Sequence, residues 1–78
     1  MPNQHNFPDR ETVEKIKRMY PKGCRVELVY MGEDPYNRLR PGDRGTVSFV
    51  DDTGTIFVNW DCGSRLGMAY GVDRIREI

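Results

Sequence analysis

Apolar and polar residues alternate in short runs through most of the chain after Gly23, and these runs are rich in β-branched and aromatic residues. Both features are typical of β-strands. They predict strands at residues 24–31, 46–50, 55–60, 65–70 and 75–78. Segments of turn-forming residues separate the central strands: Pro41-Gly42, Asp51–Gly54 and Asp61–Ser64. The pattern predicts a mainly β chain, a meander of about five short antiparallel strands that can curl into a small barrel.

The segment before the strands has a helical period and predicts one amphipathic α-helix over residues 9–21. Asp9 can cap its first turn, and Pro21 ends it. Three apolar residues fall on one face of this helix: Val13, Ile16 and Tyr20. Two pairs of opposite charge have the spacing of intrahelical ion pairs: Glu11 with Lys15, and Glu14 with Arg18. We expect the apolar face to pack on the barrel, although a basic face that contacts phosphate is an alternative.

The alternation also predicts which strand residues enter the core. One face of the first strand is apolar: Val26, Leu28 and Tyr30. Ile56 and Val58 are expected in the core, and Trp60 is expected to be only half covered because it lies at a strand end. Val50 interrupts the alternation of its strand, so either a β-bulge resets the pattern or the turn begins there.

Length and charge limit the range of functions. The 78 residues fit one domain, with a flexible tail at residues 1–8, the helix at 9–21 and the barrel at 23–78. Twelve basic and 12 acidic residues give a net charge of 0, which argues against a strongly basic nucleic-acid binder. The first ten residues lack the apolar core of a signal peptide, and no apolar run approaches a membrane span. With only two cysteines, Cys24 and Cys62, we expect a cytoplasmic protein with reduced thiols.

No pattern of catalytic, metal-binding or cofactor-binding residues stands out. Asp51 and Asp52 are adjacent in a turn, where neighbouring side chains point apart rather than toward a shared substrate. The single histidine, His5, lies in the polar tail, far from either cysteine. Gly42 and Gly45 precede a strand rather than a helix, so they do not form a phosphate-binding loop of the usual kind. We expect no enzymatic activity and no cofactor.

Three segments resemble a known family when taken together: ETVEKIKRMYPKGCRVELVYM, DPYNRLRPGDRGTV, and VDDTGTIFVNWDCGSRL followed by GVDRIREI. Over roughly Glu11 to Ile78 the chain resembles the domain of unknown function 4314 family, which occurs in bacteria, their phages and conjugative elements. The resemblance implies an SH3-like antiparallel β-barrel and a mobile-element context. It implies no activity.

The long connection after the first strand, together with nearby aromatic residues, is the candidate binding surface. Loops of this length in small domains often carry function, and aromatic and arginine side chains dominate many binding sites. The candidate residues are Asp34, Tyr36, Arg38, Arg40, Trp60 and Tyr70.

Two hypotheses of function follow from this surface. The first is a non-enzymatic binding module that docks on a host protein or on a protein of the mobile element. The alternative is a nucleotide or oligonucleotide binder, for example one that sequesters a signalling nucleotide, in which arginines hold phosphate and aromatic rings stack on a base. A structural accessory that completes a larger assembly through its helix is a third interpretation.

Overall fold

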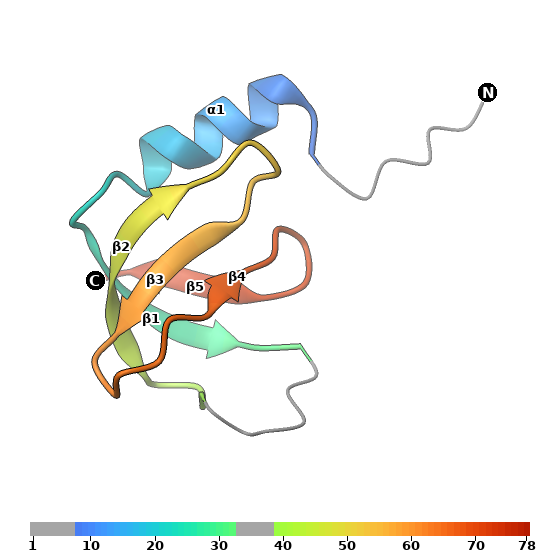
Figure 1. The fold of residues 1–78 in the computed structure, drawn as a ribbon. Helices are drawn as coiled ribbons and strands as arrows, with labels where there is room; N and C mark the ends of the chain where they lie inside the picture. The colour runs from blue at the N-terminus through green and yellow to red at the C-terminus, as the bar shows by residue number, and fades with distance from the viewer. Residues whose placement is uncertain (1–7, 33–38) are drawn as a thin grey trace.

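The computed structural model describes residues 8–32 and 39–78 (Figure 1). One helix, α1 (Arg10–Met19), precedes a single antiparallel sheet with the strand order β4-β3-β2-β1-β5. The strands are β1 (Arg25–Tyr30), β2 (Arg44–Val50), β3 (Ile56–Trp60), β4 (Gly67–Met68) and β5 (Arg74–Glu77). The prediction of a mainly β fold with about five short antiparallel strands and one N-terminal helix is confirmed. The sheet curls like a barrel but does not close, because the edge strands β4 and β5 are not hydrogen-bonded to each other.

Helix α1 begins where its sequence predicts and packs on the sheet of its own chain (Figure 1). Asp9 is the N-cap, and its side chain accepts a hydrogen bond of 2.9 Å from the N–H of Thr12. Val13 and Ile16 are buried, as their spacing predicts. Burying an isoleucine side chain contributes roughly 1.5–3 kcal/mol relative to leaving it exposed, so Ile16 is a major anchor of the helix.

The predicted ion pairs of the helix are not present among the described residues. Glu14 lies 3.9 Å from Arg10 rather than beside Arg18. Lys17 instead reaches the turn between β2 and β3, where its Nζ lies 3.2 Å from Asp52. Lys15 forms no ion pair within the described part of the chain.

The core lies inside the curl of the sheet and is closed on one side by α1. Its most completely buried side chains come from four different strands: Val26, Leu28, Val47, Val58 and Met68. Ile16 from the helix and Leu39 from the segment before β2 complete it. Ile56 and Val58 are in the core, as predicted.

Two β-bulges change which residues face the core. The register between β2 and β3 shifts between Val47 and Phe49, which decides the open question about Val50 in favour of a bulge. Phe49 is consequently 52% exposed and stacks on Phe57, with 4.6 Å between ring centroids. A second shift, between Leu28 and Tyr30 in the pairing of β1 with β5, leaves Tyr30 exposed. The prediction that Tyr30 continues the apolar face of β1 is therefore wrong.

Strand β4 is much shorter than the predicted strand at residues 65–70. The carbonyl of Ser64 accepts a hydrogen bond from the N–H of Trp60, and the N–H of Ala69 donates to the Asp73 carboxylate. The first bond closes the turn that follows β3 and the second belongs to the turn before β5, and β4 pairs with β3 only at Met68 with Ile56 and at Gly67 with Phe57. Only two residues remain for the ladder.

The turn between β2 and β3 is organised by Asp51. Its Oδ1 accepts hydrogen bonds from the hydroxyl of Thr53 at 2.6 Å, from the N–H of Thr53 at 2.9 Å and from the N–H of Thr55 at 3.0 Å. Partial desolvation acts to raise the pKa of the Asp51 carboxyl, but these hydrogen bonds outweigh it and hold the pKa below its ordinary value. The carboxylate form thus stabilises the turn.

We predict that Asp51 makes the stability of the protein fall at acid pH. Because the folded-state pKa lies below the unfolded value of about 3.9, the ionised carboxylate stabilises the fold above that pH, and the contribution is lost as the pH falls through the folded-state pKa. Asp51→Asn removes the charge and keeps an accepting oxygen. Urea unfolding from pH 7 to pH 2.5 is expected to show a smaller loss of stability at acid pH for the variant than for the wild type. Parallel stability curves would contradict the assignment.

Candidate functional site

Trp60 is part of the core rather than of an exposed binding surface. Its side chain is only 3% exposed, and its indole Nε1–H donates a 3.1 Å hydrogen bond to the carbonyl of Leu66. A buried N–H without a partner costs about 1–3 kcal/mol, and this bond removes that cost. The prediction that Trp60 is half covered is wrong, and the indole has no surface in this structure with which to bind a partner.

The other predicted binding residues divide into two groups. Three of them, Asp34, Tyr36 and Arg38, lie outside the described residues. Arg40 is exposed and belongs to a tight turn, in which its N–H donates to Asp43 and its carbonyl accepts from the N–H of Asp43. Tyr70 is 52% exposed and is the one described candidate that lines a cavity.

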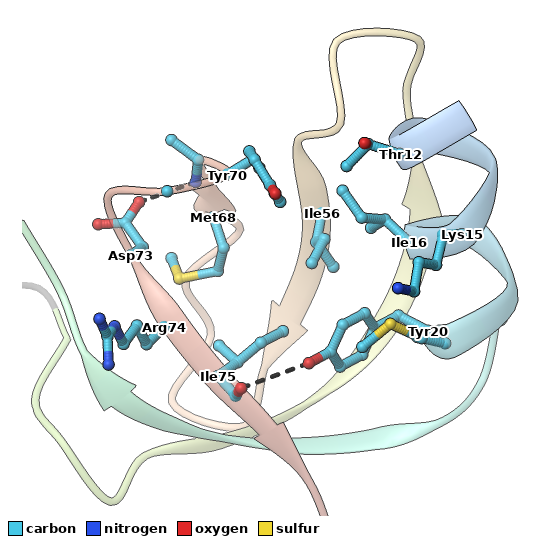
Figure 2. A pocket seen from close by; sticks show the side chains of 13 residues that line it. Thr12, Lys15, Ile16, Tyr20, Ile56, Met68, Tyr70, Asp73, Arg74 and Ile75 are labelled. Atoms are coloured by element: carbon cyan, nitrogen blue, oxygen red, sulfur yellow. Dashed lines mark hydrogen bonds between the residues drawn. The ribbon is translucent and has the colours of Figure 1, made fainter. Parts of the chain in front are cut away.

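That cavity is an open groove of about 540 Å³ between α1 and the sheet, which we call the helix–sheet groove (Figure 2). Its apolar floor consists of Ile16, Ile56, Met68 and Ile75. Figure 2 shows Ile16 from α1 and Tyr20 from the C-cap of the helix reaching it, with Met68 and Tyr70 on the opposite side and Ile56 between them. The groove occupies the place where β4 and β5 fail to join.

Tyr20 ties the helix to the edge of β5. Its hydroxyl lies 3.4 Å from the carbonyl of Ile75 and donates to it (Figure 2). Partial burial raises the pKa of the Tyr20 phenol above its ordinary value, and the Glu77 carboxylate acts in the same direction. The phenol therefore stays protonated at neutral pH and available as a donor.

The ionisable side chains of the groove give it a basic rim. Lys15 and Arg74 line the groove, and neither forms an ion pair with another described residue. Asp73 also lines it, but both of its oxygens are occupied: Oδ1 accepts from the N–H of Gly32 at 2.7 Å and Oδ2 from the N–H of Ala69 at 2.8 Å. Among residues 8–32 and 39–78, no carboxylate neutralises either cation.

Groups with catalytic potential have other partners in this structure. Asp51 accepts three hydrogen bonds in its turn, and Asp52 is paired with Lys17. Partial burial, reinforced by Glu77, raises the pKa of the Cys24 thiol, which keeps it from being a reactive thiolate. Within residues 8–32 and 39–78, no three histidine, cysteine or acidic side chains gather as metal ligands. None of the helices described there has the length and apolarity required to cross a membrane.

Comparison with known proteins gives one match. The sequence model of a family described as a domain of unknown function (DUF4314) matches residues 9–78. The chain belongs to this family. No curated protein and no solved structure matches the DUF4314 chain. The family resemblance expected from the sequence is thereby confirmed, and the matched range includes α1 and all five strands.

Sequence reasoning about this DUF4314 domain missed most of the groove. Lys15 and Tyr20 were expected on the helix and Met68 on a distant strand, and Arg74 was one cation among many. The only local signal was Tyr70, an aromatic residue beside a glycine turn. The other residues come together only because α1 packs beside the turn between β4 and β5.

We predict that the fluorescence of Trp60 reports a dry environment. Trp60 is the only tryptophan of the chain, so the emission of the folded protein comes from one indole. Because the ring is buried, emission at the blue end of the tryptophan range and weak quenching by acrylamide are expected. The urea-unfolded protein provides the exposed reference. Red emission and strong quenching in the folded protein would show that the indole is at the surface.

Proposed function

We propose that this DUF4314 protein is a non-enzymatic binding module that docks on a protein partner through the helix–sheet groove. The observation that carries the proposal is the groove itself, an apolar cavity of about 540 Å³ bounded by two cations that have no ion-pair partner among the described residues. Cavities of roughly 300–1,000 Å³ are typical of ligand sites. Exposed Met19 and Tyr70 add contact area at its rim.

The proposed occupant is a segment of a partner protein with an apolar anchor and an acidic residue. The buried aliphatic floor favours a large apolar side chain, whose removal from water contributes about 25 cal/mol per Å². Lys15 and Arg74 at the rim favour a carboxylate beside that anchor, because charge complementarity fixes orientation and excludes other partners. The docking surface is thus centred on α1 and Tyr70 rather than on Trp60.

The proposal also includes that the protein is not an enzyme and that it acts in the cytoplasm. Asp73 is the one carboxylate among the described residues that line the groove, and its two oxygens already accept hydrogen bonds, which supports a site that binds without reacting. Free thiols at Cys24 and Cys62 support action in the cytoplasm. The setting that the family resemblance implies, bacteria with their phages and conjugative elements, belongs to the proposal and would make the partner a protein of the host or of the element.

A nucleotide is the second candidate ligand, and the size of the groove favours it. Tyr20 and Tyr70 border a cavity that could admit a base, and Lys15 and Arg74 could hold phosphate. The aliphatic floor offers few polar groups to recognise the edge of a base, which is why a peptide is the first proposal. If a nucleotide binds, calorimetry against a panel of cyclic and linear nucleotides should show heat that Tyr70→Ala abolishes. Flat traces across the panel would eliminate this candidate.

We predict that linear peptides selected from a displayed random library will bind the wild-type protein through the basic rim. Reversing the charge in Lys15→Glu or Arg74→Glu is expected to weaken their binding by about tenfold or more, equivalent to about 1.4 kcal/mol. Isothermal titration calorimetry provides the dissociation constants. Arg65→Glu is the matched control, because Arg65 is exposed and does not line the groove.

The result that would overturn the proposal is equally specific. Selected peptides that bind Lys15→Glu, Arg74→Glu and Arg65→Glu as tightly as the wild type would place recognition elsewhere. Failure of the library to yield any peptide would count against a protein partner. If a nucleotide from the panel then bound, the nucleotide would become the preferred ligand. Thermal unfolding of each variant confirms that a change in affinity is not a loss of fold.

A further inference from the structure

A second hollow lies on the other side of the turn that borders the helix–sheet groove. It measures about 450 Å³ and is lined by Val29, Tyr30, Gly71, Val72 and Arg74, and we call it the outer hollow. Gly71 and Arg74 line both cavities. The two cavities are therefore neighbours along one surface, with the arginine at their common border.

The bulge in β1 brings apolar side chains to the outer hollow. Successive residues of a regular strand point to opposite faces, so one of two neighbours is normally covered. The register shift between Leu28 and Tyr30 instead leaves both Val29 and Tyr30 exposed, the latter by 55%. Val72, from the turn between β4 and β5, is also 55% exposed and completes the patch.

The turn that separates the cavities is firmly held. Asp73 connects it to the end of β1 through the N–H of Gly32 and closes it through the N–H of Ala69. The N–H groups of Val72 and Asp73 both donate to the carbonyl of Ala69. A Cβ atom at Gly32 would lie only 2.8 Å from Cγ1 of Val72, so the turn packs closely against the segment that follows β1. A fixed separation between two apolar cavities is a preorganised feature, which lowers the entropic cost of binding.

We infer that the outer hollow is a second subsite for the same partner segment, so that the protein recognises two apolar anchors on either side of an acidic residue. This inference rests on the proposed function and specifies its partner class. One anchor lies in the helix–sheet groove, the carboxylate meets Arg74, and the second anchor contacts Tyr30 and Val72. Aromatic and aliphatic side chains that are half exposed beside a cation are typical of interface hot spots.

The charge of the surface favours this occupant. Arg74 forms no ion pair with any residue in the described part of the chain. By contrast, Arg44 and Arg76 both reach Glu27 at 3.3 Å, and Arg25 lies 2.6 Å from Asp61. Arg74 lies at the border of the two cavities and, unlike these three arginines, is not paired with a described residue. Its charge matches a carboxylate between two apolar anchors.

The test uses peptides selected on the wild-type protein from the displayed random linear library. Each selected peptide is synthesised at full length and in two versions in which one apolar anchor is replaced by serine. Calorimetry then measures their binding to the wild type and to Tyr30→Ala, Val72→Ser, Lys15→Glu and Phe49→Ala. Phe49 is the matched control, because it is exposed to a similar degree and lines neither cavity.

The expected result is a loss of roughly tenfold in affinity for the full-length peptide with Tyr30→Ala or Val72→Ser, and none with Phe49→Ala. Replacing the peptide anchor that occupies the outer hollow should weaken binding to the wild type by a similar factor. The same replacement should weaken binding to Tyr30→Ala little further, because both changes remove the same contact. Selection on Tyr30→Ala should enrich peptides that keep only one anchor.

Two outcomes would overturn the inference, and they are distinguishable. Peptides that lose affinity with Lys15→Glu but not with Tyr30→Ala or Val72→Ser would leave the helix–sheet groove as the binding site and remove the second subsite. Peptides indifferent to all of these variants, or no peptides at all, would remove the proposed function and the subsite with it.

Discussion

The side chain of Ile16 is the contact on which the rest of the arrangement depends. It is buried in the core that the sheet only partly encloses, and so it fixes the helix beside the gap between β4 and β5. A chain of this length buries only about 60% of its unfolded surface, so a helix that closes an open sheet makes a large contribution to its stability. The same packing leaves one side of the gap uncovered, and that side is the helix–sheet groove.

The two bulges determine which apolar side chains remain at the surface. Without the shift between Leu28 and Tyr30, strict alternation would direct Tyr30 to the face that Leu28 occupies. The shift beside Phe49 likewise directs a large aromatic ring outward, where it stacks on Phe57. Bulges occur often near functional sites because they re-aim side chains without interrupting the sheet. Here the bulge in β1 exposes Val29 and Tyr30, so that a strand of the core also contributes side chains to a candidate binding surface.

The position of Trp60 shows why residue type alone is a poor guide to a binding site. Tryptophan is common in interfaces, but it is equally suited to a core when its N–H has a partner. The carbonyl of Leu66 provides that partner, and the hydrogen bond also fixes the segment that leads to β4. Trp60 thus supports the site indirectly, through the strand that carries Met68 into the groove floor.

The sequence by itself determined the helix, its cap at Asp9, the approximate strands and the turn residues, because these depend on neighbours within a few positions. It also identified Tyr70 as a candidate, although for a different surface. The tertiary structure alone decided the burial of Trp60, the bulges and the groove. Those features depend on contacts between distant segments, such as the one between Tyr20 and Ile75, which are 55 positions apart. Local patterns of polarity carry no information about which distant surfaces meet.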